Sequence, residues 1–174
     1  MFQRLLEYDA RWSRRLRVAE QPGLLRRAAI VLAHSGDSWF WLGALILVAA
    51  FGSTFWRWWA VALALAILIT AVIVLAVKFT VRRQRPAGEW GALYRNTDPH
   101  SFPSGHAARV FLLAALVFAL GPVWLAWILA IWAPLVALAR VAMGVHYLSD
   151  VLVGALLGLV LAAGFILGVQ GIVA

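Results

Sequence analysis

Long stretches without any charged residue alternate with short polar stretches along this chain. Residues 38–56, 58–77, 110–139 and 151–174 contain no Asp, Glu, Lys or Arg. A helix that crosses a bilayer needs about 20 apolar residues, and the third stretch is long enough for two short helices. The pattern therefore predicts an all-α integral membrane helical bundle with about five transmembrane helices.

The polar breaks set the bounds that we expect for these spans. The first span covers about residues 38–52, the second ends near 78, the third covers about 103–121, the fourth about 123–141, and the fifth runs from about 150 to the C-terminus. The Gly121-Pro122 dipeptide predicts a tight hairpin between the third and fourth spans. Pro134 predicts a kink within the fourth.

The first 34 residues have a different pattern. Residues 1–20 alternate Leu, Tyr, Trp and Val with Arg at helical spacing, which predicts an amphipathic helix lying in the membrane interface. A disordered basic tail is the alternative. Residues 24–34 are too short to span alone, so they lie on the surface or extend the first span. We therefore expect one domain over 1–174, with an interfacial segment over 1–34 and a transmembrane bundle over 38–172.

Composition supports this class and narrows the partners. Hydrophobic residues make up 64% of the chain and charged residues 13%, against about 25% charged residues in soluble domains. The absence of cysteine excludes disulfides and thiolate metal sites. The net charge of +8 could suggest nucleic acid, but the aromatic residues lie in or beside apolar runs, where tryptophan marks the bilayer interface. The bilayer and its anionic lipids, and no nucleic acid, are the expected partners.

Most of the unusual polar residues converge on one face of the membrane if the chain has five spans. The end of the second span, the start of the third, the end of the fourth and the start of the fifth then share that face. Polar groups near membrane depth are costly and mark functional sites. The residues placed together are Lys78, Arg82, Arg85, His106, Arg140, His146 and Asp150.

Three of these cations follow one another at helical spacing. Lys78, Arg82 and Arg85 stand at i, i+4 and i+7, which predicts three cations on one helical face. We interpret this face as an anion cradle; side chains that reach for lipid headgroups are the alternative. Arg83 lies off the face, and we expect it to be solvated or to face lipid.

The Pro-Ser-Gly-His sequence at residues 103–106 predicts the start of a helix. Ser104 can cap it, the free N–H groups of its first turn attract anions, and Gly105 lets a ligand approach the backbone. A capping serine beside an interfacial histidine, His106, would also explain the sequence.

Arg109 follows His106 by three residues and is harder to interpret. It makes a second phosphate contact, forms an ion pair with Asp37, Asp98 or Glu89, or reaches for headgroups.

His146 and Asp150 stand at i and i+4 at the start of the fifth span. The carboxylate can accept one ring N–H and fix the tautomer, so that the other nitrogen faces the cradle as a nucleophile. A structural His–Asp pair is the alternative. Arg140 adds a fourth cation. Because no aspartate cluster suits magnesium, we expect neither a metal nor a cofactor.

Together these motifs resemble the type 2 phosphatidic acid phosphatase superfamily, which also includes vanadium haloperoxidases. The resemblance covers residues 78–150 and consists of three blocks in order: Lys78 with six residues before Arg85-Pro86, then Pro-Ser-Gly-His, then Arg140, five residues, His146, three residues and Asp150. One position departs from the family. Ala139 stands where a serine usually precedes the arginine of the third block, which removes one hydrogen bond to Arg140 or phosphate.

The resemblance implies a role for each site residue. His146 would attack phosphorus and form a phosphohistidine, Asp150 would orient it, and His106 would protonate the leaving oxygen and then activate water. The phosphoryl oxygens would be held by Lys78, Arg85, Ser104, the Gly105 amide and Arg140, with Arg82 and Arg109 as additional candidates. Phosphoryl transfer depends on positioning and charge neutralisation, which these cations can supply without a metal.

The expected function is that of a membrane lipid phosphatase. Its substrates would be phosphate or diphosphate monoesters of lipids, such as undecaprenyl or another polyprenyl diphosphate, phosphatidic acid or phosphatidylglycerophosphate. Two alternatives remain: a phosphotransferase, in which another lipid replaces water, and a non-catalytic protein that binds anionic lipid. Haloperoxidase activity is not expected, because those relatives are larger and soluble.

The two signals for membrane orientation disagree. Seven arginines lie in residues 1–27, and the positive-inside tendency would place that end and the site in the cytoplasm. The family usually places the site outside. Arginines that bind phosphate or lie in an interfacial helix are weak evidence for topology. We therefore expect a bacterial inner-membrane protein whose site faces the periplasm.

Overall fold

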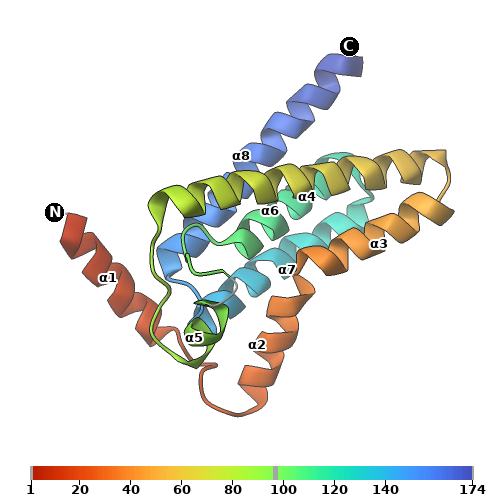
Figure 1. The fold of residues 1–174 in the computed structure, drawn as a ribbon. Helices are drawn as coiled ribbons and strands as arrows, with labels where there is room; N and C mark the ends of the chain where they lie inside the picture. The colour runs from red at the N-terminus through yellow and green to blue at the C-terminus, as the bar shows by residue number, and fades with distance from the viewer. Residues whose placement is uncertain (1, 96–97, 174) are drawn as a thin grey trace.

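The computed structural model describes residues 2–95 and 98–173, and this part of the chain is helical apart from its connections. Its helices are α1 (Phe2–Arg15), α2 (Leu24–Ser35), α3 (Ser38–Phe51), α4 (Thr54–Val81), α5 (Glu89–Arg95), α6 (Gly105–Leu120), α7 (Val123–Ala142) and α8 (Leu148–Val173). The all-α prediction is confirmed. Figure 1 shows α6 in the middle of the bundle, with α4, α7 and α8 around it.

Helix length and hydropathy test the expected spans. Three described helices, α4, α7 and the first 22 residues of α8, are long and apolar enough to cross a membrane. The helices α2 and α3 qualify only as a pair, which is bent by 50° at the break between them. The helix α6 is apolar but has 16 residues, about 24 Å at 1.5 Å per residue. A membrane-spanning bundle is confirmed, and the count of five spans stays a prediction.

The predicted bounds agree with the helices to within a few residues. The spans expected over 38–52, 103–121 and 123–141 correspond to α3, α6 and α7. Residues 24–34 form most of α2, which is joined to α3 through the bend, and whether they extend the first span stays a prediction. The helix α7 continues through Pro134. The polar stretch 79–102 contains the short helix α5, which the sequence pattern did not predict.

Two glycines bring α6 and α8 into backbone contact. A Cβ atom at Gly154 would lie 2.5 Å from the carbonyl oxygen of Ser104, and one at Gly158 would lie 2.1 Å from that of Ala108. Spaced by four residues, the two glycines form one small face, as at many close helix contacts in membranes. The backbone N–H of Ser104 also donates to the carbonyl of Asp150 at 2.9 Å. The helix start that carries His106 is therefore fixed against the start of α8.

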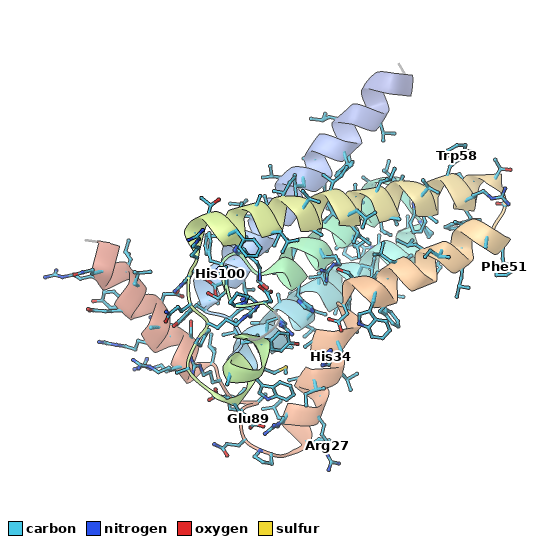
Figure 2. The ribbon with its side chains drawn as sticks, in the orientation of Figure 1. Arg27, His34, Phe51, Trp58, Glu89 and His100 are labelled. Carbon is cyan, nitrogen blue, oxygen red and sulfur yellow. The ribbon has the colours of Figure 1, made fainter. Side chains whose placement is uncertain are left out.

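Polar groups gather at one end of the bundle. Figure 2 shows Phe51 and Trp58 at one end, and Arg27, Glu89 and His100 towards the other. The core between the ends is apolar and centres on buried leucine and valine side chains of α6, including Leu112, Leu113, Leu116 and Val117. The convergence expected from five-span parity is thus observed.

The N-terminal helix α1 is amphipathic, as predicted, although it ends at Arg15. Its large apolar side chains Leu5, Tyr8 and Trp12 are exposed, while Asp9 and Ser13 face the bundle through hydrogen bonds to the start of α8. Its place in the membrane interface stays a prediction.

Candidate active site

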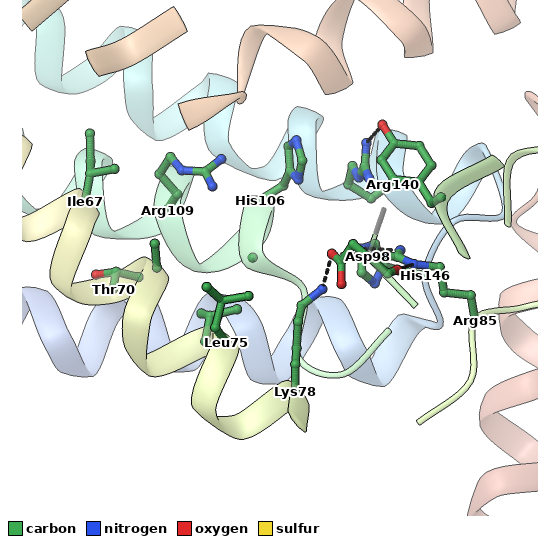
Figure 3. A pocket seen from close by; sticks show the side chains of 14 residues that line it. Ile67, Thr70, Leu75, Lys78, Arg85, Asp98, His106, Arg109, Arg140 and His146 are labelled. Carbon is green, nitrogen blue, oxygen red and sulfur yellow. Dashed lines mark hydrogen bonds and ion pairs between the residues drawn. The ribbon is translucent and has the colours of Figure 1, made fainter. Parts of the chain in front are cut away.

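A cavity of about 290 Å³ opens at the polar end of the bundle, between α4, α6 and α7. One wall is charged and holds Lys78, Arg85, Asp98, His106, Arg109, Arg140 and His146. The rest of the lining comes from the same helix as Lys78, α4, and consists of the apolar Ile67, Ala71, Val74 and Leu75 together with Thr70. Figure 3 shows that the charged side chains point into a common space. The cavity therefore suits a molecule with an anionic head and an apolar tail.

Three cations in this wall are almost fully buried. Lys78, Arg85 and Arg140 are 3%, 4% and 1% exposed. Buried charges are stable only when they are paired or hydrogen-bonded. Asp98 accepts from Lys78 Nζ at 2.5 Å and from Arg85 Nη2 at 2.7 Å, whereas Nε of Arg140 has no hydrogen-bond partner among the described residues. One carboxylate against three cations leaves a site that attracts a further anion.

Asp98 was considered in the sequence only as a partner for Arg109, and its place between two phosphate-binding candidates was missed. Burial by itself would raise the pKa of Asp98, but Lys78 and then Arg85 outweigh this effect and lower the pKa below its usual value. Asp98 is therefore a carboxylate that occupies part of the anion cradle.

Tyr94 from α5 is a second residue that the sequence analysis missed. Its ring lies 5.3 Å from the guanidinium carbon of Arg85 and 4.9 Å from that of Arg140, and its hydroxyl accepts a hydrogen bond from Arg140 at 3.3 Å. Aromatic faces attract guanidinium groups at such distances. Because α5 is short and lies in a polar stretch, only the tertiary structure reveals this contact.

His146 lies in the turn between α7 and α8, just before α8 begins at Leu148, so its expected position on the fifth helix is wrong. The turn is made possible by Gly144, which has φ of 69°, a left-handed conformation that favours glycine. His146 is nevertheless close to Asp150, with Nδ1 3.5 Å from Oδ2. The i, i+4 spacing thus predicted that the two side chains lie close together, although Nδ1 has no hydrogen-bond partner among the described residues and His146 lies outside the helix.

The neighbours of His146 define its tautomer. Nη1 of Arg85 lies 3.2 Å from Nε2, and because a guanidinium can only donate, Nε2 must be the acceptor. The ring proton is then on Nδ1, on the side of Asp150. Burial, followed by the charges of Arg85, Arg140 and Lys78, holds the pKa of His146 well below its usual value. His146 is therefore a neutral imidazole whose lone pair faces the cations.

Asp150 is fixed at both carboxylate oxygens. Oδ1 accepts from Nη1 of Arg83 at 2.7 Å, and Oδ2 accepts from the backbone N–H of Tyr147 at 2.9 Å. The prediction that Arg83 is solvated or faces lipid is wrong, because its guanidinium also pairs with Asp9 at 2.6 Å. Arg83, which the sequence analysis did not count among the site residues, thus holds the carboxylate of Asp150 that lies beside His146.

His106 lies across the cavity from His146 and also contacts a carboxylate. Its Nε2 lies 2.6 Å from Oδ1 of Asp37, which lies at the break between α2 and α3. Arg109 lines the cavity as expected, but it donates to the carbonyl of Gly36 rather than pairing with the carboxylates considered for it. The bend between α2 and α3 thus supplies acceptors to both residues of α6.

Of two candidates at helix ends, Ser104 behaves as predicted and Arg82 does not. Ser104 caps α6, with Oγ accepting from the N–H of Ala107 at 3.4 Å, and it is buried behind the Gly105 backbone that lines the cavity. Arg82 is exposed, and its Nε donates to the carbonyl of Phe79 at 2.8 Å. The predicted three-cation helical face is therefore wrong: α4 ends at Val81 and Arg82 has φ of 52°.

A membrane-embedded helical bundle with two histidines and buried cations around one cavity defines a candidate phosphate-transfer site. The sequence profile of the PAP2 superfamily matches residues 59–173. The chain belongs to this superfamily, and it is a membrane lipid phosphatase.

Individual relatives agree with this assignment. Decaprenylphosphoryl-5-phosphoribose phosphatase of Mycobacterium tuberculosis is 37% identical over 84% of this chain and 81% of its own length. Undecaprenyl-diphosphatase of Sulfolobus acidocaldarius is 32% identical over 79% of this chain and 68% of its own length. The crystal structure of a PAP2-type phosphatidylglycerolphosphate phosphatase from Bacillus subtilis matches with a TM-score of 0.76 at 25% identity, and covers 98% of this chain and 88% of that one.

Proposed function

We propose that this phosphatase releases phosphate from a polyprenyl-linked lipid that carries a terminal phosphate or diphosphate group. The observation that carries the proposal is the neutral Nε2 of His146 among Lys78, Arg85 and Arg140, in a cavity that apolar side chains of α4 also line. Two relatives that act on polyprenyl lipids, at 37% and 32% identity, support this substrate class over glycerophospholipids.

The proposed reaction proceeds in two balanced steps. Nε2 of His146 attacks phosphorus as the bond to the lipid or leaving phosphate oxygen breaks, and His106 gives a proton to that oxygen. The intermediate is a phosphohistidine whose Nδ1–H faces Asp150. Water then gives a proton to His106 and its oxygen attacks phosphorus, which breaks the P–N bond and releases inorganic phosphate.

The remaining site residues would stabilise charge during both steps. Lys78, Arg85 and Arg140 would hold the equatorial oxygens, which carry most of the negative charge in phosphoryl transfer. The unpartnered Nε of Arg140 supports this role. The Gly105 amide at the start of α6 and the guanidinium of Arg109 line the same space. Ser104 would act mainly through its helix cap.

A phosphate-release assay over a lipid panel tests the proposal. The panel contains undecaprenyl diphosphate, decaprenylphosphoryl-5-phosphoribose, phosphatidic acid and phosphatidylglycerophosphate in mixed micelles. We expect the polyprenyl lipids to be preferred and His146→Ala to abolish release. His100→Ala is the matched control, because the His100 ring packs edge-on against Phe79 and does not line the cavity. Preference for a glycerophospholipid would refute the substrate class, and full activity of His146→Ala would refute the nucleophile.

Membrane orientation is part of the same proposal. In the inner membrane, the end of the bundle that carries the cavity would face the periplasm, where the free phosphate can leave. Cysteines introduced singly at Ala92, on α5, and at Ser53, between α3 and α4, report the two ends of the bundle, and both positions are exposed. We expect an impermeant maleimide to label only the cysteine at position 92 in intact cells. Labelling of position 53 alone would place the site in the cytoplasm.

A further inference from the structure

A second polar cluster joins α1 to the turn before α8. It consists of Asp9 and Ser13 from α1, Arg83 from the segment after α4, and Ser149 from the start of α8. We infer that α1 is a positioning element of the nucleophile: Asp9 holds Arg83 and the first turn of α8, and thereby fixes Asp150 against His146. This inference rests on the proposed role of His146.

The first step of the argument is the capping of α8. The first N–H groups of a helix have no partner inside the helix, and a side chain just before it usually accepts from them. Here the acceptors come from α1: Oγ of Ser13 accepts from the N–H of Leu148 at 2.8 Å, and Oδ1 of Asp9 accepts from the N–H of Ser149 at 3.0 Å. Ser13 is fully buried. The start of α8 therefore depends on a helix more than 130 residues away in the chain.

The second step is the guanidinium of Arg83, which links two carboxylates. Its Nη2 donates to Oδ2 of Asp9 at 2.6 Å, and its Nη1 donates to Oδ1 of Asp150 at 2.7 Å. The ring of Tyr147 lies 4.0 Å from its guanidinium carbon. Charge-assisted bonds of this kind are about twice as strong as neutral ones. Asp9 thus determines where Arg83 presents its second donor.

The third step leads to His146, which lies outside any helix. Nη1 of Arg85 lies 3.2 Å from its Nε2, and Oδ2 of Asp150 lies 3.5 Å from its Nδ1, which has no hydrogen-bond partner among the described residues. Arg83, which Asp9 holds, donates to Oδ1 of Asp150, and Asp9 also accepts from the N–H of Ser149 in the same turn, so two of the contacts that place this carboxylate involve Asp9. The N–H of Tyr147, which donates to Oδ2, does not depend on Asp9. Loss of Asp9 would remove these two contacts and loosen Asp150, while the contact of Arg85 with Nε2 of His146 would remain.

The orientation of α1 agrees with this role. A surface helix of a soluble protein buries its apolar face, whereas α1 exposes Leu5, Tyr8 and Trp12 and turns Asp9 and Ser13 inward. The contacts between α1 and the bundle are thus polar and directional, which suits a helix that orients other groups. Arg17 and Ala19 continue the attachment, with bonds to the carbonyls of residues 87 and 142.

Steady-state kinetics of Asp9→Asn test the inference. We expect kcat for the best lipid substrate to fall about 10-fold to 100-fold, as for a misplacement of catalytic groups by about 1 Å, while KM changes less than about twofold. Glu7→Gln is the matched control, because it removes the same charge from the exposed side of the same helix, and its kcat should equal that of the wild type. Ser13→Ala, which removes one cap, should give a smaller loss.

A double-mutant cycle separates positioning from general destabilisation. If Asp9 acts through Asp150, Asp9→Asn should change kcat less than about twofold in an Asp150→Asn background, because the coupled route is already broken. An equal loss in both backgrounds, or an unchanged kcat in Asp9→Asn, would overturn the inference. If the wild type releases no phosphate from any lipid, the proposed function fails instead.

Nuclear magnetic resonance of histidine labelled with ¹⁵N gives an answer that does not depend on turnover. We expect the wild type, Glu7→Gln and Asp9→Asn to share the Nδ1–H tautomer of His146, because Arg85 still donates to Nε2. Only in Asp9→Asn should the Nδ1–H signal shift, because the carboxylate of Asp150 beside it is displaced. The His146→Ala variant assigns the signal. An Nδ1–H signal in Asp9→Asn that is unchanged from that of the wild type would overturn the inference even for an inactive enzyme.

Discussion

Replacement of Arg85 by alanine is the most direct test of whether the buried cations Lys78, Arg85 and Arg140 hold the phosphoryl group. The Arg85 side chain makes four hydrogen bonds. Nε donates to the carbonyl of Asp98 at 2.7 Å, Nη2 to its carboxylate at 2.7 Å, and Nη1 to the carbonyl of Val145 at 3.1 Å and to Nε2 of His146 at 3.2 Å. The guanidinium therefore lies beside the nitrogen to which phosphorus would bond. Its loss should raise the barrier of the chemical step.

The magnitude follows from the number of charges that remain. Removing one donor that stabilises developing negative charge costs about 2.7–4 kcal/mol, or about 10² to 10³ in kcat. Lys78 and Arg140 stay in the cavity, so we expect kcat of Arg85→Ala to fall by this factor rather than to zero. Burial and the neighbouring Arg140 lower the pKa of Arg85, and Asp98 opposes them. Arg85→Lys keeps a charge but replaces the planar fork by one ammonium, and it should lose less.

Single-turnover and steady-state phosphate release in mixed micelles measure this effect. Arg82→Ala is the matched control, because Arg82 is an exposed arginine three residues away whose Nε bonds only the local carbonyl of Phe79. Thermal unfolding of each variant shows whether the fold persists. The reasoning is refuted if folded Arg85→Ala retains kcat within about threefold of Arg82→Ala.

Three further predictions concern packing, anion competition and pH. Gly158→Ala should lower the unfolding temperature, because its Cβ would meet a backbone oxygen at 2.1 Å and overpacking costs about 1–3 kcal/mol. Gly164→Ala should leave the unfolding temperature unchanged, because no atom lies within 4 Å of its Cβ. Equal unfolding temperatures of the two variants would contradict the close packing at Gly158. Asp98→Asn should lower the inhibition constant of inorganic phosphate several-fold, since it removes the negative charge that pairs with two cations; an unchanged or higher constant would contradict this. The His146 ring should titrate below pH 6.5 in ¹⁵N spectra. On the acid side, kcat/KM should therefore fall as the pH drops through that lowered pKa, because the ring gains a proton and loses its lone pair. Titration above pH 6.5 would exclude a nucleophile that the cations keep neutral.

Sequence pattern alone located the long helices, because a charge-free run of about 20 residues has few alternatives to a buried helix. The same reasoning paired His146 with Asp150. The same reasoning failed where the predicted helix was longer than the observed one. The helix α4 stops at Val81, so Arg82 turns outward while Arg83 and Arg85 reach the site from an irregular segment.

The pattern of apolar and polar residues in the sequence could not predict contacts between distant segments. Asp98, Tyr94 and Asp37 each complete the surroundings of a site residue, but none belongs to a helix that also carries that residue. Asp9 illustrates the reason. In the sequence it is one acidic residue in a basic segment, and only the fold brings it to Arg83. Local periodicity carries no information about such pairings.

Because α6 and α8 meet backbone to backbone at Gly154 and Gly158, the spacing between the two histidine-bearing segments is set without any side chain. The apolar wall of the cavity belongs instead to α4, on residues 67–75. Apart from Lys78, which α4 also carries, the charged site residues and the apolar lining thus come from different segments. Substitution of Ile67 or Leu75 should therefore change which hydrocarbon tail the cavity accepts, while His106 and His146 keep their positions.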